Sequence, residues 1–308
     1  MTDFMVASGA TADLSGSITV TGDMTNDGTV NCGTSSLTMS GTSDQTISGN
    51  ATSLYNITVN KSSGNLIMST PVTVTGTLTM TSGDIVNSQP ITIGTSDDVT
   101  GDINHTSGAV TGQMKRFFSS STGSKFFPVG IAGTERGVTV NFATSGPGVN
   151  QYLTAEYKTG LPTLSGSDAH YSGLPLTTSD GQLIQNFHED GYWDISPGST
   201  STGDSYTTSI NAKEYTVSIH MNDLRDAAGE NQDKDKVRII KSAGSNTPSQ
   251  HHVSWTGMTH VSTSGTNADF TVVATGTGFS TFGAGAPDSD ALPVELISFT
   301  GNCVDGVV

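Results

Sequence analysis

The clearest candidate metal ligands in the sequence are three oxygen-bearing side chains at alternate positions, Asn231, Asp233 and Asp235. This spacing resembles the opening of a calcium-binding loop, because Ca²⁺ takes carboxylate and amide oxygens as ligands. The glycine and the terminal glutamate of a complete loop are missing downstream. The pattern therefore indicates either a Ca²⁺ site or, as the favoured interpretation, a solvated acidic turn. No other cofactor is indicated.

Tyr192 and Trp193 form the aromatic part of a second candidate site, which follows the polar run His188-Glu189-Asp190. Aromatic rings beside carboxylates can stack on sugars and hydrogen-bond their hydroxyls, and paired carboxylates can hydrolyse glycosidic bonds. The cluster therefore indicates a carbohydrate-binding site at Tyr192 and Trp193. A tryptophan in a strand often points into the core of a β-sandwich, and this favours a core position for Trp193 instead.

Threonine recurs between two apolar residues throughout the first third of the chain. If these threonines stack in register, their hydroxyls form a flat ladder that can bind an ordered surface, such as ice or a crystalline polysaccharide. Threonine is also an ordinary outward-facing residue of β-strands, and the irregular spacing of the copies argues against strict register. The second explanation is favoured. The threonines are Thr19, Thr38, Thr58, Thr73, Thr79 and Thr92.

Sequence motifs of the common enzyme classes are missing. No GxSxG, HExxH or P-loop pattern occurs, and the glycines at 276 and 278 precede no predicted helix. We therefore expect no catalytic residue and no enzymatic activity. A polysaccharide-degrading β-helix enzyme is the less favoured alternative, because the repeated region is short and lacks a cluster of basic and acidic residues.

The elements that would position these residues begin with a repeat that spans residues 1–112. Its copies recur at intervals of about 20 residues, which suits one coil of a β-solenoid. Period-2 alternation places the two apolar side chains of each copy on one face and the threonine on the other. An antiparallel sandwich is the competing arrangement. The solenoid is favoured because the copies resemble one another in sequence: Ile18-Thr19-Val20, Leu37-Thr38-Met39, Ile57-Thr58-Val59, Leu78-Thr79-Met80 and Ile91-Thr92-Ile93.

Beyond residue 112 the repeat stops, and aromatic and charged residues become frequent. Alternating strand-like segments separated by turn residues predict an antiparallel β-sandwich over 113–282. The small residues of 283–291 predict a linker, and 292–308 read as a terminal strand that opens a truncated domain. The expected fold class is therefore all-β.

The segment Ala291-Leu292-Pro293-Val294-Glu295-Leu296-Ile297-Ser298-Phe299 resembles the LPVELxSF sequence of many Bacteroidetes surface proteins. Residues 54–64 are similar to the repeats of their β-solenoid regions. Residues 126–130 and 190–194 resemble the domain that follows those repeats. In that family a type IX secretion sorting domain normally comes next, and 292–308 contain none. The resemblance implies an extracellular or cell-surface location, with that secretion route implied for a longer parent protein.

Charge and hydropathy exclude two classes of partner. The formal net charge of −16 argues against nucleic acid, and no apolar run is long enough for a membrane span. The first ten residues do not resemble a signal peptide, so we expect a fragment of a longer extracellular protein.

We expect a structural or adhesion protein, a stalk or a self-assembling fibre module, with a polysaccharide or a cell surface as a further partner. The alternative is a carbohydrate-binding module. Homopolymers would form through the solenoid ends or through the terminal strand, because exposed strand edges pair with other chains. The apolar residues of that strand are Leu292, Val294, Leu296 and Phe299.

Overall fold

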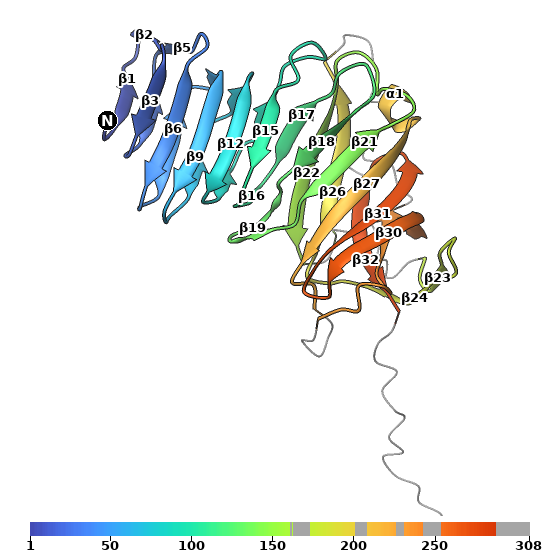
Figure 1. Cartoon of the computed structure of the whole chain (residues 1–308). Coiled ribbons are helices and arrows are strands. Elements are labelled where there is room, and N and C mark those ends of the chain that lie inside the picture. The colour runs from blue at the N-terminus through green and yellow to red at the C-terminus, as the bar shows by residue number, and fades with distance from the viewer. Residues whose placement is uncertain (161, 163–172, 201–207, 226–230, 243–253, 288–308) are drawn as a thin grey trace, which may run out of the picture.

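The computed structural model describes residues 1–160, 162, 173–200, 208–225, 231–242 and 254–287. Within these ranges the chain is almost entirely β-structure, and a single short helix, α1 (Thr208–Asn211), is present (Figure 1). The all-β fold class expected from the sequence is therefore confirmed. No helix among the described residues is long and apolar enough to cross a membrane.

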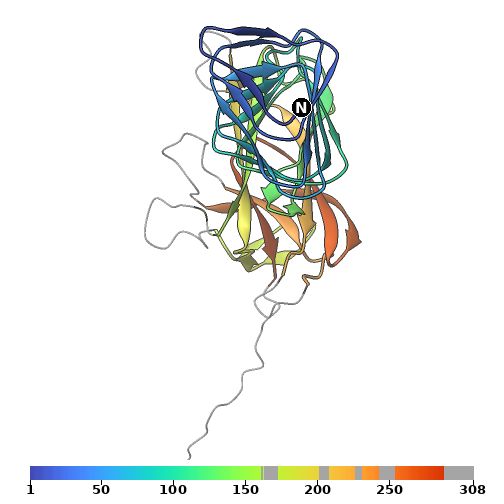
Figure 2. The ribbon, with the colours of Figure 1, turned by 90° about the vertical axis from the view of Figure 1, so that its left-hand side faces the viewer.

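The N-terminal third forms a β-solenoid of about six turns, built from stacked parallel strands (Figure 2). The first sheet contains β1 (Phe4–Val6), β4 (Met24–Asn26), β7 (Gln45–Gly49), β10 (Leu66–Met68), β13 (Ile85–Asn87) and β16 (Val110–Thr111). The second contains β3 (Ser17–Val20), β6 (Ser36–Gly41), β9 (Asn56–Lys61), β12 (Thr77–Ser82) and β15 (Asp102–His105). The third side contains the pair β2 (Thr11–Asp13) and β5 (Thr29–Asn31), then β8 (Thr52–Leu54), β11 (Val72–Val74), β14 (Ile91–Ile93) and β17 (Met114–Phe117).

Alternation along each strand explains why the coils stack. In β12, Leu78 and Met80 point inward and are fully buried, while Thr79 lies on the outer face. One coil cannot bury its inner face alone, so each coil depends on the apolar side chains of its neighbours. The β-solenoid predicted for the N-terminal part of the chain is therefore confirmed, and its third side extends to β17, beyond the predicted limit at residue 112.

Beyond the solenoid, its third side continues into an antiparallel region. Strand β17 is parallel to β14 and antiparallel to β22, so one ten-stranded sheet runs through both parts. The added strands are β22 (Gln151–Thr159), β26 (Gly191–Ser199), β32 (Thr281–Ala286), β28 (Arg238–Ser242), β29 (Trp255–Gly257) and the short β25 (Asn186–Phe187), which pairs with β32.

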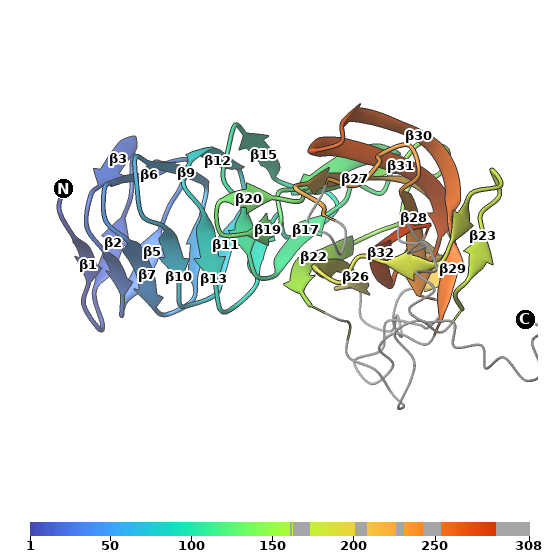
Figure 3. The same cartoon turned by 90° about the horizontal axis from the view of Figure 1, so that it is seen from below.

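A separate antiparallel sheet of five strands completes this region (Figure 3). Its strands are β18 (Gly123–Phe127), β21 (Val138–Phe142), β27 (Glu214–Asn222), β31 (Asp269–Thr277) and β30 (Thr259–Thr266). Four further short strands are β19 (Gly130–Ile131), β20 (Thr134–Glu135), β23 (Leu176–Thr177) and β24 (Leu183–Ile184).

One hydrophobic core extends from the solenoid into the antiparallel region without interruption. It runs from Val20 and Met24 in the first coils, through Met114 on β17, to Trp193 and Phe282. Continuous burial across the junction opposes a hinge there, because bending would expose apolar surface to water.

The linker expected at 283–291 is not a linker in its first four residues. Gly283 to Ala286 belong to β32, which pairs with β25, β26 and β28. A Cβ atom at Gly285 would lie 2.7 Å from Ile184 and 2.9 Å from Ile240. The small residues that suggested flexibility are instead required by close packing. Residues 288–308 lie outside the described part of the chain.

Candidate functional site

Four threonines of the second solenoid sheet lie in strict register. Thr19 pairs with Thr38, Thr38 with Thr58, and Thr58 with Thr79, and the row ends at Asn104. Along the sequence these threonines are 19, 20 and 21 residues apart. The turns absorb the difference, so irregular spacing does not prevent the ladder. The strand separation sets a hydroxyl repeat of about 4.8 Å.

A second polar row flanks the threonine ladder on the same outer face. It consists of Ser17, Ser36, Asn56, Thr77 and Asp102, and the partial row of Ser40 and Asn60 lies on the other side. We call these three rows the hydroxyl face. Among its members Asp102 alone is charged at pH 7, although the whole chain carries a net charge of −16. The result is a flat, nearly uncharged array of small polar groups on an acidic protein.

The remaining two threonines of the repeat lie elsewhere. Thr73 and Thr92 pair with each other on the third side of the solenoid, in a row that begins at Ser53 and continues to Lys115. The structure therefore divides the six threonines between two sheets, and only the second sheet has the four-membered ladder.

Trp193 occupies the core position that its strand context favoured. Its side chain is 1% exposed, its indole Nε1 donates to the carbonyl of Arg136 at 2.6 Å, and its ring meets that of Tyr157 edge-on. Tyr192 is also buried. The faces of Trp193 are therefore covered by protein, and the carbohydrate-binding site expected at Tyr192 and Trp193 has no exposed tryptophan on which a sugar could stack.

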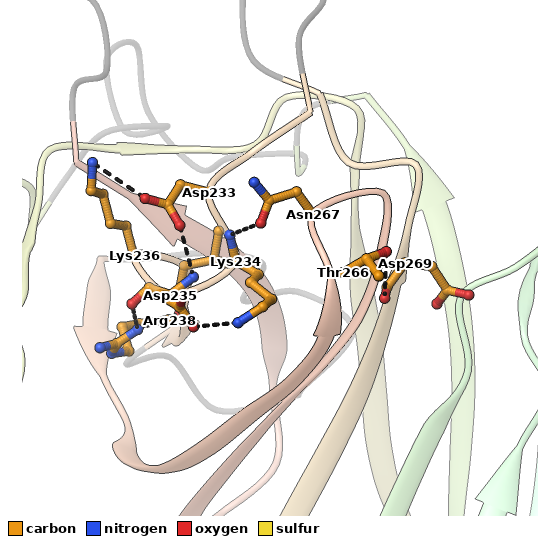
Figure 4. Close-up of polar contacts among 9 residues, drawn as sticks. Asp233, Lys234, Asp235, Lys236, Arg238, Thr266, Asn267 and Asp269 are labelled. Carbon is orange, nitrogen blue, oxygen red and sulfur yellow. Dashed lines mark hydrogen bonds and ion pairs between the residues drawn. The ribbon is translucent and has the colours of Figure 1, made fainter.

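Two of the proposed calcium ligands, Asp233 and Asp235, lie at a turn where their carboxylates already have cationic partners (Figure 4). Lys236 Nζ lies 3.4 Å from Asp233 Oδ2, and Lys234 Nζ lies 2.6 Å from Asp235 Oδ1. The backbone N–H of Asp235 also donates to Asp233 Oδ1 at 3.2 Å. A Ca²⁺ ion here would compete with both lysines for these carboxylates.

The third proposed ligand, Asn231, forms an isolated β-bridge with Arg225. No cluster of three His, Cys, Asp or Glu side chains suited to a metal occurs in the described ranges.

A histidine held by two carboxylates was not indicated by the sequence. His220 on β27 lies with Nδ1 2.6 Å from Glu135 Oε2 and Nε2 2.5 Å from Asp269 Oδ1. The hydrogen bond that His220 donates to Glu135, and after it the one to Asp269, raise the pKa of His220 to about 9, although desolvation acts to lower it. The imidazolium donates from both nitrogens. A histidine that is mostly protonated near neutral pH is a poor general base, and the contact ties β27 to Glu135 and Asp269.

A buried lysine lies inside the solenoid. Lys61 is 2% exposed, and its Nζ donates to Oε1 of Gln45 at 2.8 Å. A local signal for this burial exists in the sequence, because Lys61 continues the inward alternation of Ile57 and Val59 along β9.

The elements proposed for self-assembly are only partly described. Leu292, Val294, Leu296 and Phe299 lie outside the described residues. At the N-terminal end of the solenoid, β1, β2 and β3 each pair with one strand within the described part of the chain. The edge of β3 is partly covered, because the amino group of Met1 donates to the carbonyl of Thr19, whereas β1 and β2 lack a ladder partner on their outer side among the residues that the structure describes.

Comparison of the chain with protein-family models, with curated proteins and with solved structures finds no match. The function is therefore inferred from the geometry and the sequence.

Proposed function

We propose that the protein is an extracellular structural and adhesion module, a stiff stalk that presents a binding face and catalyses no reaction. The observation that supports this proposal most directly is β17, which is paired on both sides. Its Met114 is in register with Ile91 of the solenoid and with Ala155 of β22. Tension or bending at the junction must therefore break a hydrogen-bonded ladder and open a continuous core.

The antiparallel region is proposed to be a β-sandwich. Its five-stranded sheet and the antiparallel half of the ten-stranded sheet form two layers in Figure 3. Phe142 from one sheet and Ile195 and Phe282 from the other belong to the same buried core. This arrangement would close the C-terminal end of the solenoid with a compact body.

Charge and sequence resemblance support an extracellular setting. Residues 1–112 contain nine aspartates and one lysine, so the solenoid has a net charge of −8. A strongly acidic rod stays soluble and repels other copies along its sides. The LPVELxSF-like segment at 292–299 adds the resemblance to Bacteroidetes surface proteins, and the stalk is proposed to work at or outside the cell surface.

Electron-microscope images of the purified chain test the stalk directly. Straight particles of one length are expected, joined into longer assemblies if solenoid ends or terminal strands pair. Two lobes at variable angles would contradict a stiff junction.

Deletion of residues 291–308, followed by light scattering, tests whether the terminal strand takes part in assembly. An unchanged mass would exclude it from assembly. Incubation with polysaccharides tests for catalysis. The release of new chain ends would contradict a non-catalytic role.

The hydroxyl face is the proposed adhesive surface, and a crystalline polysaccharide is the proposed ligand. A repeated hydroxyl lattice suits a ligand that is itself periodic and rich in hydroxyls, and the near absence of charge reduces the cost of desolvating the face. The in-register ladder from Thr19 to Thr79 supports this proposal.

Co-sedimentation with crystalline cellulose or chitin tests the face. The double variant Thr38→Lys, Thr58→Lys should stay in solution while the wild type sediments. The two long lysine side chains break the flat array of hydroxyls and add positive charge to it. The matched control Thr73→Lys, Thr92→Lys changes the third side and should sediment normally. Equal sedimentation of both variants would contradict the assignment. If the wild type does not bind the polysaccharide but alters the growth of ice crystals, the ligand of the face is ice.

A further inference from the structure

Lys61 and Gln45 form a polar pair inside the solenoid wall, where the corner between its first and second sheets is closed. Lys61 ends β9 and Gln45 begins β7, one coil earlier. Both side chains are almost completely buried, at 2% and 1% exposure. Burying a lysine is costly unless its ammonium group is paired or hydrogen-bonded, because that group leaves water.

The amide of Gln45 is fixed in one orientation. Its Nε2 donates to the carbonyls of Val20 and Gly22 in the coil below, at 3.1 and 2.5 Å. The carbonyl oxygen Oε1 is thereby turned toward Lys61, whose Nζ lies 2.8 Å away. The amide carbon Cδ is one bond from that oxygen, so the nucleophile and the carbonyl carbon are held as close neighbours, as an intramolecular reaction requires.

The coil above keeps Lys61 in place. A Cβ atom at Gly83 would lie 2.8 Å from Cβ and 3.4 Å from Cγ of Lys61, so the stem of the lysine packs directly against this glycine. Gly41 occupies the position of Lys61 in the coil below. The lysine therefore fills a space that glycines leave, and packing restricts it to the direction of Gln45.

Electrostatics also favour a reactive amine. Desolvation lowers the pKa of Lys61, while Asp44 and Asp23 counteract part of this effect. A lowered pKa increases the neutral fraction of an amine, and the neutral form is the nucleophile.

We propose that Lys61 and Gln45 join in an intramolecular isopeptide bond. The lone pair of neutral Nζ attacks Cδ of Gln45, and the carbonyl electrons move onto Oε1. The tetrahedral intermediate collapses with cleavage of the Cδ–Nε2 bond. One proton passes from Nζ to the departing nitrogen, which leaves as ammonia. The products are a secondary amide and one ammonia, and no oxidant, metal or second substrate is needed.

The new bond would tie two successive coils together at one corner. Residues 45 and 61 are separated by 16 positions, so the bond closes a loop that contains most of one coil. Such a covalent tie would resist unwinding of the solenoid under tension. The inference concerns this pair alone and does not depend on the proposed adhesive function.

Mass spectrometry of the unfolded chain tests the proposal. The folded protein is first incubated at about pH 9, where more of the lysine is neutral. The expected mass is that of the sequence less one ammonia.

Trypsin supplies a second readout, because Lys61 is the only lysine or arginine in residues 1–114. An acylated Lys61 is not cleaved, so residues 1–115 should remain one peptide. The full sequence mass together with cleavage after Lys61 would overturn the proposal and leave a hydrogen-bonded pair only.

Two variants and a control separate the bond from other losses of ammonia. Gln45→Glu replaces the amide by an unreactive carboxylate, and Lys61→Met removes the nucleophile. Both should show the full mass expected from their sequences, with circular dichroism as the check of folding. The control Gln89→Glu changes an exposed glutamine of the solenoid and should still lose one ammonia. Loss of ammonia in the Lys61→Met variant would assign the reaction to another residue and refute the proposal.

Discussion

At the scale of single residues, His220 links the stability of the protein to pH. Its pKa is raised from the ordinary value of 6.5 to about 9 by Glu135 and Asp269. A raised pKa means that the folded state holds the proton more tightly. The stabilisation is therefore complete below about pH 6.5 and is lost as pH rises through about 9. We expect the free energy of unfolding to fall by about 2 kcal/mol. This is less than the full pKa shift implies, because the Asp269 side chain is 63% exposed and solvent screens its interaction with His220.

Urea unfolding at about pH 6 and about pH 9.5 measures this loss. The variant His220→Gln should be less stable than the wild type at the lower pH and should lose little more on going to the higher one. His105→Gln is the matched control, because the ring of His105 bonds a backbone carbonyl, that of Gly108, rather than a carboxylate. If the wild type and His220→Gln lose equal stability between the two pH values, the clamp does not contribute as described.

The partners of His220 could not be found from the sequence. Glu135 and Asp269 lie 85 and 49 residues away, and local patterns contain no information about contacts at that distance. Trp193 differs, since its place in an alternating strand already favoured burial. Lys61 lies between these cases: its alternation with Ile57 and Val59 is a local signal of an inward position, although we did not predict it, and its partner Gln45 becomes evident only once the coils are stacked.

At the scale of elements, β32 tests how tightly the antiparallel sheets pack. The substitution Gly285→Ala adds a methyl group within 3 Å of Ile184 and Ile240. Neighbouring side chains must shift, and such overpacking costs about 1–3 kcal/mol. Gly123→Ala is the matched control, because nothing lies within 4 Å of its Cβ position. Thermal melts of the two variants give the comparison, and equal melting temperatures would contradict the packing described for β32.

The repeated elements were predictable and the irregular ones were not. Apolar residues on either side of a threonine defined the inward and outward faces of each coil, which was enough to predict the solenoid. The same spacing misled about register, because turns of different length absorb the extra residues between Thr38 and Thr79. At β32 the sequence 283–286 has the composition of a linker, although tight packing against Trp255 and Ile240 is what selects glycine there.

At the scale of the whole molecule, the solenoid and the antiparallel region should unfold as one cooperative unit. Both tryptophans, Trp193 and Trp255, lie in the antiparallel region, so tryptophan fluorescence reports on that region alone. The substitution Leu78→Ala removes a fully buried side chain from the solenoid and should cost about 2–5 kcal/mol. Because core and sheet are continuous through β17, this distant cavity should lower the denaturant midpoint of the fluorescence transition.

Circular dichroism, which reports on all strands, should give the same midpoint as fluorescence in the wild type and in Leu78→Ala. The neighbouring substitution Thr79→Ala lies on the outer face of the same strand and should shift both midpoints little. If Leu78→Ala leaves the fluorescence midpoint unchanged while circular dichroism shows strands lost at a lower denaturant concentration, the two parts unfold separately. A stalk that transmits tension through β17 requires the coupled result, because a junction that separates on its own would yield first under load.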